Sequence, residues 1–189
     1  LCTINKKKYK IFISLFSGVG KSPTTKDHDI YDHRNIHCDV LVVGAGISGI
    51  LAAKNAAKNN FKTLLLDEKN ELGGSTIFEA NEDNKINNNL ASEWLKKEIN
   101  ELKNIKNLEF KTRTSVAAYH QYNYLLAREN LTDHLVKKDK KNKIRQRLLK
   151  IRAKKVILAT GALELPLIFN NNDRPGIMLS SAIKKYSNF

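Results

Sequence analysis

Three glycines at a fixed spacing are the residues of this chain whose pattern points most directly to chemistry. Gly44-Ala45-Gly46-Ile47-Ser48-Gly49 matches GxGxxG. In that pattern Gly44 permits a tight turn, Gly46 lets the backbone approach a pyrophosphate, and Gly49 allows a helix to pack closely on a strand. Ser48 lies where the helix would begin, and the free N–H groups of a first helical turn attract phosphate. The pattern predicts a dinucleotide site.

A carboxylate follows at the distance that such a site requires. Residues 61–66 form an apolar run that ends in Asp67-Glu68, and Asp67 lies 23 positions after Gly44. A carboxylate there accepts hydrogen bonds from the adenosine ribose and would repel a 2′-phosphate, so NAD or FAD is favoured over NADP. Leu72-Gly73-Gly74-Ser75 offers a second close backbone approach, at a spacing typical of glutathione-reductase-like flavoproteins.

The elements that must position these residues follow from hydrophobic patterning. The run 39–43 is unalternated and β-branched, as in a strand buried on both faces of a parallel sheet, and a helix follows from residue 50. A strand over 156–161 ends in Ala159-Thr160-Gly161, with small residues where backbone meets pyrophosphate. The remaining expected elements are a helix over 90–104 and strands over 108–110, 112–119, 122–127 and 144–151. The predicted fold is α/β, a Rossmann-like parallel sheet with an antiparallel β insertion.

Composition and cysteine content bear on the class of protein and on its compartment. The chain has 189 residues, 41% of them hydrophobic, with a formal net charge of +14. Two cysteines, Cys2 and Cys38, form neither a disulfide framework nor a metal site, so a reducing, cytoplasmic location is the expectation. No apolar run approaches the ~20 residues of a membrane span. We expect no membrane association, no metal and, in this segment, no catalytic residue.

The positive charge is concentrated in one stretch. Between Lys137 and Lys155 there are 11 basic residues and one acid. Lys, Asn and Ile are all abundant and share A/T-rich codons, so codon usage accounts for much of the basicity. A nucleic-acid surface would also need a reading element, and none is evident. A solvated turn over 137–143 and an adjoining strand face are the expected structure, with an anionic partner as the alternative.

The sequence of the N-terminal part of the chain indicates no catalytic or binding site. Residues 1–37 are expected to be a linker or the end of a preceding region, and 38–189 an FAD/NAD-binding domain truncated at its C-terminus. Gly18-Val19-Gly20-Lys21-Ser22 imitates a phosphate-binding loop, but Leu15 occupies the position of the first required glycine. Lys6 to Phe16 imitates a secretory signal without a clear cleavage site.

Several further segments resemble the alpha subunits of heterotetrameric sarcosine oxidases. The resemblance runs from about Gly18 to the end and is most specific near the C-terminus. The segments that carry it include Asn35-x-His37-Cys38-Asp39, Arg113-Thr114-x-Val116, Ala159-Thr160-Gly161-Ala162-Leu163-Glu164 and Asn172-Asp173-Arg174-Pro175-Gly176.

The resemblance implies an oxidoreductase that converts sarcosine to glycine with formation of peroxide and a one-carbon unit. It implies that this domain binds NAD, with FAD as the alternative. The site would be lined by Ser48, Asp67, Glu68, Lys69, Ser75 and the backbone of Val116. It also implies partner beta, gamma and delta subunits, FMN and FAD on the beta subunit, and tetrahydrofolate in a C-terminal part not contained here.

Two other functions stay open from the residues. One is the alpha subunit of a related dye-linked dehydrogenase acting on proline, opines or glycine. The other is a non-enzymatic basic module that binds nucleic acid.

Overall fold

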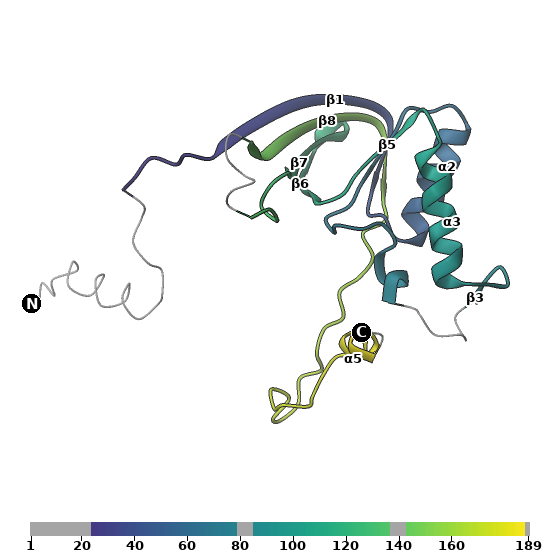
Figure 1. Cartoon of the computed structure of the whole chain (residues 1–189), viewed down its shortest axis with the longest axis vertical. Helices are drawn as coiled ribbons and strands as arrows, with labels where there is room; N and C mark the ends of the chain where they lie inside the picture. The colour runs from purple at the N-terminus through teal and green to yellow at the C-terminus, as the bar shows by residue number, and fades with distance from the viewer. Residues whose placement is uncertain (1–23, 79–84, 137–142, 188–189) are drawn as a thin grey trace, which may run out of the picture.

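The computed structural model describes residues 24–78, 85–136 and 143–187, and is built around one six-stranded sheet (Figure 1). The strand order is β5-β2-β1-β8-β7-β6. The parallel strands are β1 (Ile30–Val43), β2 (Thr63–Leu66), β5 (Leu108–Lys111) and β8 (Ile144–Leu158). The strands β7 (Tyr124–Asn130) and β6 (Thr114–His120) continue the sheet in antiparallel pairs. The predicted fold class is confirmed.

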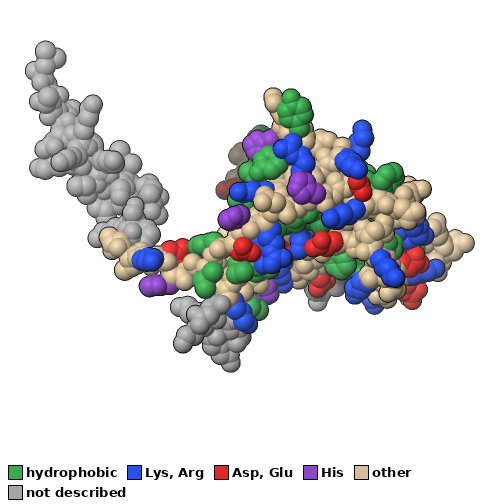
Figure 2. Space-filling view, turned by 90° about the horizontal axis from the view of Figure 1, so that it is seen from above, with side chains coloured by type: hydrophobic (Ala, Val, Ile, Leu, Met, Phe, Trp, Pro, Cys, Tyr) green, Lys and Arg blue, Asp and Glu red, His purple; other side chains and the backbone are tan. Residues whose placement is uncertain are grey.

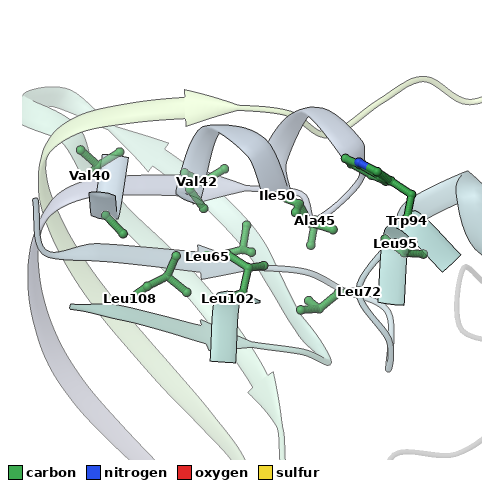
Figure 3. Close-up of a cluster of buried hydrophobic side chains, with 12 residues drawn as sticks. Val40, Val42, Ala45, Ile50, Leu65, Leu72, Trp94, Leu95, Leu102 and Leu108 are labelled. Atoms are coloured by element: carbon green, nitrogen blue, oxygen red, sulfur yellow. The ribbon is translucent and has the colours of Figure 1, made fainter. Parts of the chain in front are cut away.

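Two helices cover the β1–β2–β5 part of one sheet face (Figure 3). Helix α2 (Ile47–Lys58) directly follows β1, and α3 (Ala91–Lys103) packs beside it. Ile50 and Ala53 of α2 and Leu102 of α3 are buried against Val42 of β1. Lys54 joins the helices by ion pairs to Glu98 and Glu101, at 2.5 and 2.6 Å. Trp94, Leu95 and Leu102 of α3 are all part of this core.

A second core lies on the opposite side of the sheet. Leu41 of β1, Leu66 of β2, Leu125 of β7 and Ile151 of β8 are all buried in it. Residues far apart in sequence thus meet across four strands. Because both faces of the central strands are buried, β1 from Val40 to Val43 and all of β2 lack polar alternation.

Short elements complete the described chain. They are the 3-10 helices η1 (Gly74–Phe78) and η2 (Gln121–Asn123), the hairpin strands β3 (Lys85–Ile86) and β4 (Asn89–Leu90), and helix α5 (Ser180–Ser187). Among the residues described, no helix is long and apolar enough to cross a membrane. The imitation phosphate loop, the Lys6–Phe16 segment and most of the expected 137–143 turn lie outside the described residues.

Two expectations about strand boundaries were wrong. Residues 30–37 were expected to belong to a linker or to the end of a preceding region, but they form the first part of β1 and pair in parallel with β8. Similarly, the strands expected at 144–151 and 156–161 are one continuous strand that ends at Leu158. Both errors have one cause. The long β1–β8 pairing supplies backbone hydrogen bonds that make these residues a strand, and the local sequence pattern does not indicate this pairing.

Candidate functional site

The glycine-rich loop connects β1 to α2, and two of its glycines are fixed by packing within the protein. Gly44 has φ +99°, and a Cβ built on it would lie 2.3 Å from the carbonyl oxygen of Ala159. A Cβ on Gly49 would lie 1.8 Å from the carbonyl oxygen of Gly44. Any side chain at either position would collide with backbone. These glycines therefore allow the turn and the close approach of α2 to β1, as the sequence predicts.

Gly46 differs from the other two, because a Cβ built on it meets nothing within 4 Å. Its φ of −71° is open to any residue, so neither strain nor packing explains a glycine here. Gly46 is the N-cap of α2, which has no side-chain cap and no acidic residue in its first turn. The free N–H groups and the positive dipole end of α2 thus face open space, which is the environment that a phosphate group prefers.

Asp67, at the end of β2, is buried and linked to two backbone amides. Its Oδ2 accepts a hydrogen bond from the N–H of Ala45 at 2.6 Å, and its Oδ1 accepts one from the N–H of Lys69 at 2.8 Å. The carboxylate therefore ties the glycine-rich loop to the turn after β2. Each oxygen keeps a second lone pair that could accept from a ribose hydroxyl.

Backbone hydrogen bonds hold the other loops of the site together. The N–H of Gly73 donates to the carbonyl of Ala45, and the N–H of Thr114 donates to the carbonyl of Asp67, both at 2.7 Å. The N–H of Ala159 donates to the carbonyl of Val43, also at 2.7 Å. Segments that follow β1, β2, β5 and β8 consequently converge at the carboxyl edge of the sheet, where ligands bind in open α/β sheets.

These segments enclose a cavity of about 760 Å³. It is large enough for a sizeable part of a dinucleotide. Most of the predicted site residues line it together, namely Gly44, Gly46, Ser48, Asp67, Glu68, Lys69, Gly74, Ser75, Val116, Thr160 and Gly161. Gly49 and Gly73 do not line it. A Cβ on Gly73 would collide with the side chain of Leu95, so this glycine, like Gly49, serves packing beneath the site.

Sequence reasoning missed several lining residues. Thr76, Thr114, Ser115 and Ala162 also face the cavity, as does Ala159. Thr114 belongs to the Arg113-Thr114-x-Val116 motif, so the sequence already indicated that residues around it are near the site. Thr76 directly follows the Gly73-Gly74-Ser75 turn, and this position likewise indicated that it lies near the site. The position of Ala159 beside Gly44 depends on the parallel pairing of β8 with β1, which no local pattern reveals.

Among the described residues, the cavity has neither a cysteine thiol nor a cluster of metal ligands. Cys38 lies outside it, and burial raises the pKa of its thiol to about 11, which keeps the sulfur protonated and unreactive at neutral pH. Within the described ranges, no three His, Cys, Asp or Glu side chains are grouped so as to hold a metal ion. The arrangement can bind and orient a phosphate-containing ligand through backbone N–H groups and carboxylates.

The sequence of residues 39–162 matches the model of a protein family described as FAD dependent oxidoreductase. The chain belongs to this family. The geometry above agrees with that membership, because the strand–glycine loop–helix unit and the carboxylate after β2 are the parts that hold a dinucleotide in such folds. The chain is accordingly an oxidoreductase component with the fold of flavin-binding proteins.

Within this family, two relatives show which proteins the chain resembles over nearly its whole length. The sarcosine oxidase subunit alpha of Corynebacterium sp. (strain U-96) is 41% identical over 175 residues, which are 93% of this chain and 18% of the relative. The subunit of the same name from Rhizobium meliloti (strain 1021) is 34% identical over 183 residues, 97% of this chain and again 18% of the relative. The predicted resemblance is confirmed, over about a fifth of those relatives' length.

Solved structures share the fold at lower identity. The L-proline dehydrogenase from P. horikoshii superposes with a TM-score of 0.58 at 24% identity, covering 82% of this chain and 28% of that one. The thioredoxin reductase of Lactococcus lactis superposes with a TM-score of 0.50 at 23% identity, covering 72% and 39%. These similarities support the dinucleotide-binding fold alone.

Proposed function

We propose that the cavity binds the adenosine diphosphate portion of a dinucleotide within a sarcosine oxidase-like alpha subunit. The observation that carries the proposal is the open space at Gly46, in front of the uncapped start of α2. The backbone N–H groups of this turn and Ser48 would contact the pyrophosphate. Asp67 and Glu68, together with the neighbouring Lys69, would contact the ribose.

The remaining predicted residues complete the pocket around this arrangement. The backbone at Val116, with Thr114 and Ser115, would border the adenine, because these residues follow the turn beyond Asp67. Gly74 and Ser75 would border the phosphates from the η1 side, and Thr160 and Gly161 from the end of β8. When bound, the dinucleotide would supply the redox chemistry, and the residues described here would bind and orient it.

NAD is the proposed nucleotide, supported by the similarity to sarcosine oxidase alpha subunits. FAD is the second candidate, favoured by the family model, which is named for flavin dependence. NADP is disfavoured by either assignment, because a 2′-phosphate would meet the carboxylates of Asp67 and Glu68.

The whole protein would oxidise sarcosine to glycine, with peroxide and a one-carbon unit as the other products. Beta, gamma and delta subunits would complete it, with FMN and FAD on the beta subunit and tetrahydrofolate bound by a further region of the alpha subunit. In this proposal the amine would be oxidised on the beta subunit, apart from the cavity described here.

The test is to purify the protein, release bound nucleotide with acid and identify it by mass. NAD would support the sarcosine oxidase-like assignment, and FAD would support the second candidate. NADP, or the absence of any dinucleotide together with no binding of added NAD or FAD, would contradict the proposal.

A further inference from the structure

The outer side of the β1–β8–β7 part of the sheet is a cationic surface, which we name the basic face. Buried residues of β8 alternate with outward ones, so that Leu149 and Ile151 are in the core while Lys150 and Arg152 point away from it. Register extends this face to both neighbouring strands, since His37 and Tyr124 both pair with Arg152. Its members are His33, Asn35, His37, Tyr124, Leu126, Arg128, Leu148, Lys150 and Arg152.

Cations on the two sides of β8 have different surroundings. On the inner side, the guanidinium of Arg147 pairs with Asp32 at 2.7 Å and with Glu129 at 3.1 Å. In contrast, Arg128, Lys150 and Arg152 take part in no ion pair with the described residues. Codon usage can raise the number of lysines, but it does not place acids beside the inner cations and leave the outer ones without them.

A shallow cavity of about 400 Å³ lies at the edge of the basic face. It is lined by His37, Cys38, Asp39, Lys62, Arg152, Ala153 and Lys154. Its one carboxylate, Asp39, already pairs with Lys154 at 2.7 Å and accepts a hydrogen bond from the N–H of Lys62 at 2.9 Å. The side chains of Lys62 and Arg152 thus leave the cavity positively charged, and a carboxylate of suitable reach would be attracted into it.

Aromatic and apolar groups accompany these cations. The Arg152 guanidinium lies 5.1 Å from the centre of the Tyr124 ring, which holds it by a cation–π contact. Leu148 is 40% exposed in the middle of the face. Figure 2 shows one face of the molecule, on which Lys and Arg side chains are interspersed with Asp, Glu and His. Arginine and tyrosine around an exposed leucine are typical of protein interfaces, whereas a nucleic-acid surface would present a reading element as well.

We propose that the basic face is a docking surface for an acidic protein surface, with carboxylates of the partner paired to Arg128, Lys150 and Arg152. Helices α2 and α3 cover the β1–β2–β5 part of the same sheet face, so the partner would cover the part that these helices leave exposed (Figure 1). This docking surface is separate from the cavity at Gly46 and does not depend on which nucleotide is bound there.

The experiment measures binding of a fluorescein-labelled deca-glutamate peptide to the full chain by fluorescence anisotropy. The triple variant Arg128→Gln/Lys150→Gln/Arg152→Gln is compared with Lys96→Gln/Lys97→Gln/Lys103→Gln, which removes three exposed cations from α3 instead. We expect the first variant to bind the peptide about tenfold more weakly and the α3 variant to bind as the unaltered protein does. Should the triple variant misfold, Lys150→Glu alone replaces it.

Three results would overturn the proposal. One is an equal loss of affinity in both triple variants, which would reflect net charge alone. Another is unchanged affinity in the basic-face variant. The third is tighter binding of a DNA duplex of equal charge, or of phosphatidylserine vesicles, than of the peptide, with the same three residues responsible.

Discussion

The carboxylate of Asp67 accepts a hydrogen bond from the backbone N–H of Ala45, 22 residues earlier in the chain, at 2.6 Å. Its other oxygen accepts from the N–H of Lys69 at 2.8 Å. Asp67 therefore fixes the glycine-rich loop to the end of β2 within the protein itself. The residue expected from the sequence to be a ribose ligand is also a positioning residue for the pyrophosphate loop.

Replacing Asp67 by Asn should separate these two roles. The amide can accept only through its oxygen, so either the N–H of the buried Ala45 or that of the more exposed Lys69 loses its acceptor. We expect the free energy of unfolding without nucleotide to fall by about 1–3 kcal/mol. Urea unfolding measures this. Glu68→Gln is the control, since its side chain makes no hydrogen bond to the loop among those of the described residues, and it should leave stability unchanged. Equal stability of both variants would show that Asp67 does not hold the loop.

Gly49→Ala tests the packing of α2 on β1. The new Cβ would lie 1.8 Å from the carbonyl oxygen of Gly44, so the helix must shift away from the strand. We expect a loss of about 3 kcal/mol in the free energy of unfolding. Gly161→Ala is the comparison, because its φ is +71° but its Cβ would meet nothing within 4 Å. That variant should lose only about 1 kcal/mol. The reverse order would contradict the described geometry.

Arg147→Met tests the ion pairs on the inner side of β8. The side chains of Arg147 and Glu129 are 11% and 10% exposed, so the substitution leaves a carboxylate with less compensation in a poorly hydrated place. We expect the free energy of unfolding to fall by about 3 kcal/mol. Lys111 also pairs with Glu129 and limits this loss. Arg145→Met removes pairs with Asp29 and Asp133 that are 41% exposed on the arginine side, and it should lower the free energy of unfolding by less than about 1 kcal/mol. Chemical denaturation of both variants provides the measurement.

The start of α5 should respond to acid. The side chains and backbone N–H groups of Ser180 and Ser181 donate hydrogen bonds to Glu164, which lowers the pKa of that carboxyl from 4.5 to about 2. A lowered pKa stabilises the folded contact above the unfolded value of 4.5, and this stabilisation is lost as the pH falls from 4.5 to about 2. Amide hydrogen exchange at Ser180 and Ser181, corrected for intrinsic rates, should therefore become faster across that interval. In Glu164→Gln the protection should be weaker and independent of pH. Pronounced pH dependence in this variant would contradict the assignment.

Local sequence was sufficient for the part of the site that depends on local structure. The β1–loop–α2 unit and Asp67 were predictable because the glycines and the carboxylate each serve a need of their own strand end. The length of β1 was not predictable, because residues such as His33 and Asn35 are in a strand only through their pairing with β8. Long-range pairing also explains why Ala159 was missed as a neighbour of Gly44.

The turn at η2 shows the same limit on a smaller scale. The strand expected over 122–127 begins only at Tyr124, after this turn. His120 and Tyr124 pair across the turn, with ring centres 5.9 Å apart. Tyr122 instead has φ +58° and is 84% exposed in the turn. Tyrosine gives no signal for a left-handed backbone, so the sequence places Tyr122 in the strand rather than in the turn.

Isothermal titration of NAD and FAD into the unaltered protein and into Gly46→Val, after removal of bound nucleotide, tests the central claim most directly. The valine side chain would occupy the open space before α2 without meeting the protein at its Cβ, so the variant should fold while the pyrophosphate is excluded. We predict that the better-bound of the two nucleotides loses at least about 100-fold in affinity, or about 2.7 kcal/mol. Unchanged affinity in a folded Gly46→Val variant would show that the dinucleotide is not bound at this loop.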